Sequence, residues 1–118
     1  MTACYILDGH EVRAEPDLDA WARWMERADR TVARSEISGF VASTAFLGIA
    51  HSFRGYPPVL FETVVFNEYG DEVTADGLEM YRYATWQQAA SGHGLIVNRL
   101  KAWLRKHAEA GSAFSAFK

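Results

Sequence analysis

The sequence predicts an α+β fold, with a small antiparallel sheet of about five strands and two helices packed on one face of it. Apolar residues recur at helical spacing in two stretches, 18–32 and 86–104. Before and between them lie short stretches rich in β-branched and aromatic residues, which are typical of strands. The short links between consecutive strands favour antiparallel neighbours. The expected order is strand, helix, four strands, helix.

The first strand and the first helix lie in the amino-terminal quarter of the chain. A strand is predicted at 4–7, and 10–15 either extends it into a hairpin or forms a loop. Pro16 and Asp17 are typical of a helix start, where proline and carboxylates are favoured. The apolar face of this helix, spaced i, i+3, i+7, i+10 and i+14, consists of Leu18, Trp21, Met25, Ala28 and Val32.

Four strands are predicted to follow the first helix. The first two are 32–37 and 40–49, joined by the tight turn Ser38-Gly39. A loop at 50–58 ends in Pro57-Pro58, which forces extended geometry. The third strand is 59–66, β-branched and aromatic throughout. A polar turn at 67–77 leads to the fourth strand at 78–84.

The last helix begins with a capping box, in which Thr85 is the cap and Gln88 lies three residues later. Its apolar stripe holds helical spacing up to Trp103 and Leu104. Two glycines at 92 and 94 weaken the helix and predict a kink or close packing against the sheet. We therefore expect one domain over 1–110 and a tail over 111–118 that contains Phe114 and Phe117.

Composition limits the class of protein. A chain of 118 residues fits one domain, and its apolar content of 49% argues against disorder. The single cysteine, Cys4, cannot form an intrachain disulfide. No secretory signal and no membrane-spanning stretch is recognisable, so the sequence predicts a cytoplasmic protein without a membrane partner.

Charge is unevenly distributed, although the net charge is only −3. Residues 60–84 carry six acids and one base, whereas 85–118 carry five bases and one acid. One interpretation is a solvated turn and a helix end whose cations favour the dipole. The alternative is a basic strip for nucleic acid or an acidic partner, formed by Arg99, Lys101, Arg105 and Lys106.

The sequence contains no phosphate loop, zinc-protease motif, nucleophile elbow or calcium loop. His93 falls within the apolar stripe of the last helix, where it is either a hydrogen-bonded core histidine or a ligand or general base. Glu62 lies in the most apolar strand. It either forms a structural pair, or lies at an exposed position, or acts as a functional acid. Together with His51, these residues are weak candidates for an acid–base or metal site; no catalytic residue, metal or cofactor is assigned.

Several blocks of the chain resemble a family of small, uncharacterised proteins encoded by phages and prophages. The blocks are 21–30 (WARWMERADR), 43–51 (STAFLGIAH) with 57–66 (PPVLFETVVF), and 81–89 (YRYATWQQA) with Gly92-His93. Two features depart from the family pattern: Ala50 replaces an Asp or Asn, and the basic extension to Lys118 is an addition. The resemblance implies a phage or prophage origin and expression in a bacterial cytoplasm, and it transfers no catalytic residue.

These observations favour a non-enzymatic accessory protein that binds a host or phage protein, including the possibility of an inhibitor of host defence. Its expected binding residues are the bases Arg99, Lys101, Arg105 and Lys106 and the tail residues Phe114 and Phe117. One alternative is a nucleic-acid-associated protein that uses the basic helix. Another is a small hydrolase or metal-dependent enzyme. We also expect a homodimer whose interface includes the last helix or the tail.

Overall fold

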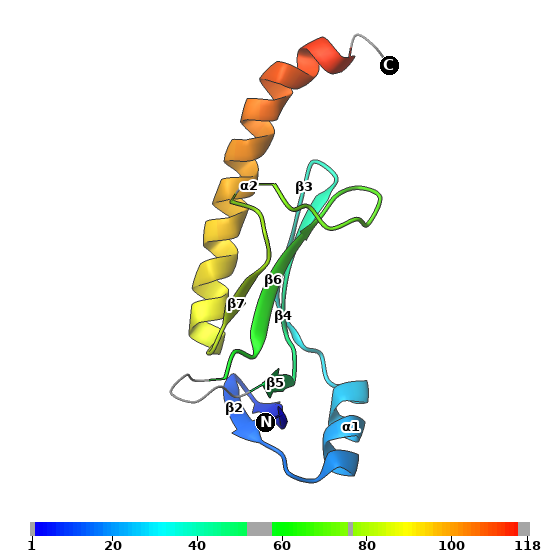
Figure 1. The fold of residues 1–118 in the computed structure, drawn as a ribbon, viewed down its shortest axis with the longest axis vertical. Helices are drawn as coiled ribbons and strands as arrows, with labels where there is room; N and C mark the ends of the chain where they lie inside the picture. The colour runs from blue at the N-terminus through cyan, green and yellow to red at the C-terminus, as the bar shows by residue number, and fades with distance from the viewer. Residues whose placement is uncertain (1, 52–57, 76, 116–118) are drawn as a thin grey trace.

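A computed structural model describes residues 2–51, 58–75 and 77–115, and it confirms the α+β class with antiparallel strands and two helices (Figure 1). The described strands form two sheets instead of one. A three-stranded sheet has the order β2-β1-β5, and a four-stranded sheet has the order β3-β4-β6-β7. The elements are β1 (Thr2–Asp8), β2 (Glu11–Ala14), α1 (Leu18–Arg27), β3 (Thr31–Ile37), β4 (Phe40–Phe46), β5 (Ile49–His51), β6 (Phe61–Phe66), β7 (Tyr81–Tyr83) and α2 (Trp86–Ser115).

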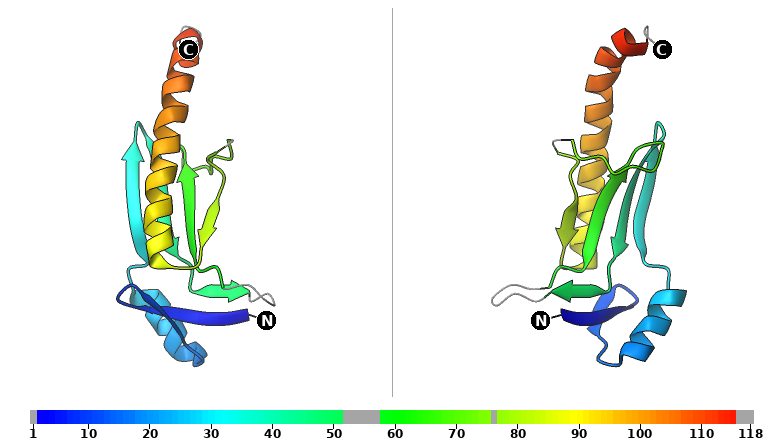
Figure 2. Two further views of the ribbon diagram at one scale, coloured as in Figure 1. Left: turned by 90° about the vertical axis from the view of Figure 1, so that its left-hand side faces the viewer. Right: turned by 45° about the vertical axis from the view of Figure 1, so that its right-hand side comes forward.

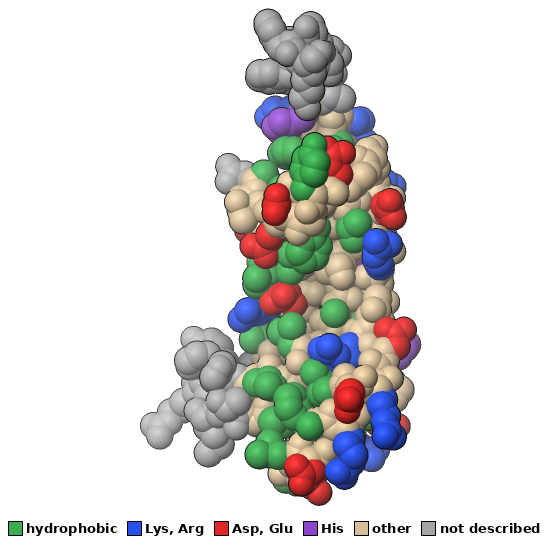
Figure 3. All heavy atoms as spheres, turned by 90° about the vertical axis from the view of Figure 1, so that its right-hand side faces the viewer, with side chains coloured by type: hydrophobic (Ala, Val, Ile, Leu, Met, Phe, Trp, Pro, Cys, Tyr) green, Lys and Arg blue, Asp and Glu red, His purple; other side chains and the backbone are tan. Residues whose placement is uncertain are grey.

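The long helix α2 covers one face of the four-stranded sheet (Figure 1). Alternate residues of β4 and β6 point to this helix, because side chains alternate between the two faces of a strand. Two apolar clusters form the core, one around Leu100 and the other around Phe46 and Phe61. The opposite face carries side chains of mixed character, as Figure 3 shows.

The predicted strand 40–49 is interrupted at Leu47 and Gly48, and its two parts belong to different sheets. Gly48 adopts a positive φ of 78°, which glycine accepts without strain. A side chain at this position would also collide with Met25 of α1. The break allows β4 to stay beneath α2 while β5 turns away to pair with β1 (Figure 2).

The sequence predicted both helices on one face of one sheet, but α1 packs on the smaller sheet and α2 on the larger one. Helix α1 packs against β1, at the end of the molecule away from the carboxyl terminus of α2 (Figure 1). The indole N–H of Trp21 donates to the backbone carbonyls of Tyr5 and Gly48, both at 3.1 Å. This bifurcated hydrogen bond fastens α1 to both β1 and the β4–β5 connection.

Both helices differ from their predicted lengths. α1 ends at Arg27 because Ala28 is extended, and Val32 therefore belongs to β3 and not to the helix. The Thr85 cap of α2 is confirmed, because the Gln88 N–H donates to the Thr85 hydroxyl at 3.1 Å. The Gln88 side chain accepts from the N–H of Ala84 at 3.0 Å, one residue before the cap. α2 then continues through Ser115, so helix replaces most of the predicted tail. Among the described residues no helix is long and apolar enough to cross a membrane.

Candidate functional site

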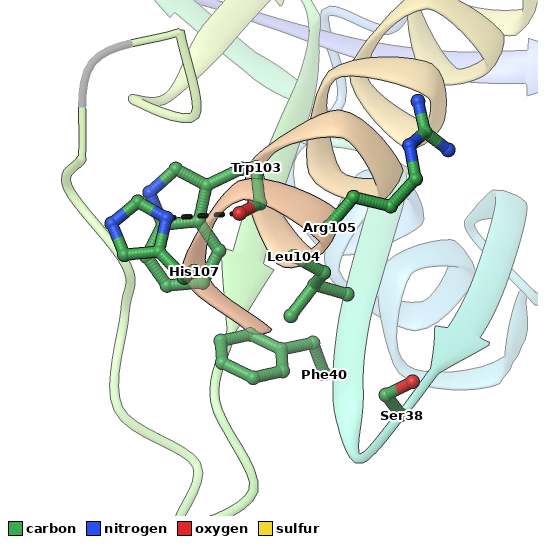
Figure 4. Close-up of a pocket in the computed structure, with 6 residues that line it drawn as sticks. All are labelled: Ser38, Phe40, Trp103, Leu104, Arg105 and His107. Atoms are coloured by element: carbon green, nitrogen blue, oxygen red, sulfur yellow. Dashed lines mark hydrogen bonds between the residues drawn. The ribbon is translucent and has the colours of Figure 1, made fainter. Parts of the chain in front are cut away.

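The candidate site is an open pocket between α2 and the turn that joins β3 to β4 (Figure 4). Its volume is about 480 Å³. The pocket, called the α2 pocket below, is lined by Ser38, Phe40, Trp103, Leu104, Arg105 and His107.

Aromatic packing shapes the floor of the α2 pocket. The rings of Phe40 and Trp103 meet edge to face with centroids 5.7 Å apart, and His107 stacks on Trp103 at 4.0 Å. The His107 ring is oriented by its Nδ1, which lies 2.9 Å from the Trp103 carbonyl oxygen and donates to it. Figure 4 shows Leu104 and Phe40 side by side with this stack. The result is an apolar surface that remains open to solvent.

Local sequence rules place these side chains. Ser38 and Gly39 both have positive φ, 51° and 86°, which is the geometry of a tight two-residue hairpin turn. The turn puts Phe40 at the start of β4, on the face that α2 covers. Trp103, Leu104 and His107 follow at i, i+1 and i+4, so they lie on neighbouring parts of the same helix face.

The basic residues of α2 flank the pocket instead of forming one strip. At about 100° per residue, Arg99 and Lys106 lie on the side of α2 toward β7, whereas Lys101 and Arg105 lie on the side toward β3. Arg99 is engaged within the domain: its guanidinium donates to the Tyr81 hydroxyl at 2.9 Å and lies 5.4 Å from the centre of that ring. Lys101, Arg105 and Lys106 are exposed.

His93 is buried between α2 and the sheet, as the sequence predicted, with only 6% of its surface exposed. Its Nδ1 lies 2.7 Å from the Thr44 hydroxyl, and its Nε2 lies 2.9 Å from the Ser35 hydroxyl. The network continues from Thr44 through Thr63 to the Tyr83 hydroxyl, which is 3.1 Å from Thr63. Burial lowers the pKa of His93 and favours the neutral ring. The structure therefore confirms a hydrogen-bonded core histidine.

Glu62 forms a structural pair, one of the roles predicted for it. Its carboxylate lies 3.2 Å from Nε of Arg82, directly across the β6–β7 ladder. The strand register places Glu62 on the face opposite to α2, whereas His93 contacts Thr44 on the α2 face. The two candidate residues are thus separated by the sheet. His51 ends β5 in the smaller sheet, opposite Thr2. No group of three metal-ligating side chains occurs within the described residues.

Sequence reasoning missed Phe40 and His107 as parts of the site. The Ser-Gly turn before Phe40 and the i+4 spacing from Trp103 to His107 were the signals available for them. Of the predicted binding residues, Arg105 lines the α2 pocket. Phe114 lies in the last turns of α2, and Phe117 lies outside the described residues.

Known proteins give no guide to this site, so it is interpreted from its own geometry. No family model, no curated protein and no solved structure matches the chain.

Proposed function

We propose that this protein is a non-catalytic interaction module that binds another protein through the α2 pocket. The observation that carries the proposal is the apolar floor of an open pocket, formed by the half-buried side chains of Phe40, Trp103 and Leu104. Open apolar surfaces with a polar rim are typical of places where a partner docks. An aromatic anchor that is already packed against its neighbours loses little conformational entropy on binding.

The rim chemistry indicates the kind of partner. Arg105 lines the pocket, and Lys101 and Lys106 are exposed on the two flanks of the same helix segment. An acid, Glu68, lies against Gly39 at the β3–β4 turn, so an acidic partner would approach from the helix side. The proposed ligand is a protein segment with one apolar anchor residue and neighbouring carboxylates.

The resemblance to phage- and prophage-encoded proteins supports a more specific form of this proposal. The partner would then be a host or phage protein in a bacterial cytoplasm, and the module would act as an accessory factor, for example an inhibitor of a host process.

The two alternative functions have less support. Nucleic-acid binding would need the bases to act together, but they lie on two flanks of α2 and Arg99 is engaged with Tyr81. An acid–base centre would need Glu62 and His93 on one side of the sheet, and they lie on opposite sides.

The test is capture of a partner from a bacterial lysate with a photo-crosslinking residue at Ser38, beside the pocket. Leu104→Glu places a charge on the apolar floor. Leu95→Glu makes the same change at an exposed leucine on the opposite flank of α2 and controls for the added charge, and circular dichroism shows whether Leu104→Glu, at a half-buried position, still folds. We expect the wild type and Leu95→Glu to crosslink the same acidic partner, and Leu104→Glu to lose it. If Leu104→Glu keeps the crosslink, or nuclease treatment removes it, the proposal is wrong.

A further inference from the structure

The strand β3 forms one edge of the four-stranded sheet, and among the described strands it pairs only with β4 (Figure 2). The two-residue turn fixes which backbone groups face β4. Ile37 and Phe40 flank the turn as a hydrogen-bonded pair, and the pairs at 35/42 and 33/44 follow the same alternation. The N–H and C=O groups of Arg34 and Glu36 therefore point away from β4, toward the free edge.

The same two residues carry opposite charges. Arg34 and Glu36 lie on the face opposite to α2, and their side chains are 57% and 63% exposed. Their charged groups are 3.6 Å apart within the chain, an exposed contact that contributes little to stability. A free edge with a basic and an acidic residue two positions apart is self-complementary, because an antiparallel copy presents the same pair in reverse order.

We propose that β3 pairs with β3 of a second copy of this chain, and that the two sheets join into one continuous antiparallel sheet. This surface is separate from the α2 pocket, and it differs from the dimer interface predicted from the sequence, which includes the last helix or the tail. In the proposed register Ser35 faces Ser35 of the partner subunit across a two-fold axis. Arg34 then lies opposite the partner's Glu36, and Glu36 lies opposite the partner's Arg34, so each pair exchanges backbone hydrogen bonds and forms an ion pair.

The alternative registers are worse. The backbone N–H and C=O groups that point to the free edge must meet the same kind of groups on the second copy. The register between the two β3 strands can therefore shift only by an even number of residues. One such shift places Arg34 opposite the partner's Arg34, and the other places Glu36 opposite the partner's Glu36. Like charges directly opposite each other are destabilising in a sheet. Charge thus selects one register and one kind of occupant, a second copy of this chain.

A glycine on α2 fits the same arrangement. Gly92 faces Tyr83 of β7 and His93 contacts Ser35, so the next residue around the helix, Gly94, lies on the flank toward β3. A Cβ at Gly94 would have nothing within 4 Å apart from its sequence neighbours and the helix's own backbone, so packing within the chain does not require glycine there. Ala90, one turn earlier, lies on the same flank. In the dimer the two α2 helices lie on the same face of the joined sheet, and the small residues on their facing flanks create no steric conflict there.

Charge reversal tests the pairing. The full-length wild type, Arg34→Glu and Glu36→Arg are compared by analytical ultracentrifugation from 1 µM to 1 mM. We expect the wild type to dimerise and each single variant to have a Kd raised by ~10-fold or more, because both symmetric pairs become repulsive. An equimolar mixture of the two variants should form a heterodimer, since glutamates at 34 and 36 of one chain then face arginines on the other. The double variant Arg34→Glu/Glu36→Arg should dimerise like the wild type.

Three results would overturn the proposal: a wild type that stays monomeric up to 1 mM, single variants that dimerise as well as the wild type, or a mixture that gives no heterodimer. Circular dichroism of each variant distinguishes lost association from lost folding. Because both side chains are exposed, we expect every variant to fold.

Discussion

Gly92 is the position where replacement by alanine should have the clearest effect on stability. A Cβ built there would overlap the ring and hydroxyl of Tyr83, well inside van der Waals contact. That hydroxyl also closes the polar network through Thr63 and Thr44 to His93. Gly94 is the matched control, because it lies two residues later in α2 and has open space around a Cβ.

The two substitutions should act in opposite directions. Replacing an unstrained helical glycine by alanine stabilises by about 0.4–1 kcal/mol, and this is the whole effect expected for Gly94→Ala. Gly92→Ala has the same gain, but it overpacks the core at a cost of about 1–3 kcal/mol and displaces a buried hydrogen bond worth about 1 kcal/mol. We therefore expect Gly92→Ala to be destabilising by about 1–3 kcal/mol, or about 4–12 °C in Tm for a domain of this size.

Urea denaturation followed by circular dichroism at low micromolar concentration measures both free energies of unfolding, with dimerisation kept small. The cause is tested by adding Tyr83→Val, which makes room for the alanine. In the double-mutant cycle, Gly92→Ala should cost less in the Tyr83→Val background than in the wild type. If Gly92→Ala proves as stable as Gly94→Ala, the close approach of α2 to β7 is wrong.

Three further predictions concern pH, an ion pair and the helix end. Burial lowers the pKa of His93, so below about pH 6.5 the unfolded chain binds a proton at this ring more readily than the folded chain does. The free energy of unfolding should therefore decrease as the pH is lowered through this range. His93→Gln should reduce that fall, measured as the difference between urea midpoints at pH 7.5 and 5.5. Glu62→Gln should destabilise by less than about 1 kcal/mol, because its partner Arg82 is largely exposed; a larger loss in urea melts would contradict this. A dimer through the tail requires that a chain ending at Glu109 be monomeric by light scattering, whereas the β3-edge dimer requires that it still associate.

Much of the fold could be predicted because local patterns specify it. The Ser-Gly turn, the capping box at Thr85 and the helical spacing up to Leu104 each depend on residues close together in the chain. The division into two sheets could not be predicted in this way. The division depends on the positive φ of Gly48 and on the close approach of Met25 of α1 to that glycine. The residues on both sides of Gly48 have the pattern of one uninterrupted strand. The end of α1 was missed because Val32 fits both a helix stripe and the strand that contains it.

The candidate site was only partly predictable, because its residues come from distant parts of the chain. Trp103 and Leu104 were identified from the apolar stripe of α2. How much of their surface stays uncovered depends on the position of the β3–β4 turn relative to the helix, which the sequence does not specify. Phe40 reaches Trp103 only through that packing. His93 was the opposite case: its position in the stripe was sufficient to predict burial, and burial requires hydrogen-bond partners.

The hydrogen bonding of the core bears on where function can lie. Every buried side-chain nitrogen and oxygen in the described part of the chain has a partner within the protein. Ser35 and Thr44 occupy both ring nitrogens of His93, so the imidazole could act on a ligand only if α2 moved away from the sheet. Such a movement would also expose the apolar cluster around Leu100. Surfaces that are already open can bind without this cost, and they include the α2 pocket and the free edge of β3. The partner proposed for the pocket would contact the helix end and the β3–β4 turn, whereas the second copy proposed for the edge would contact the middle of β3, so the two proposals are compatible.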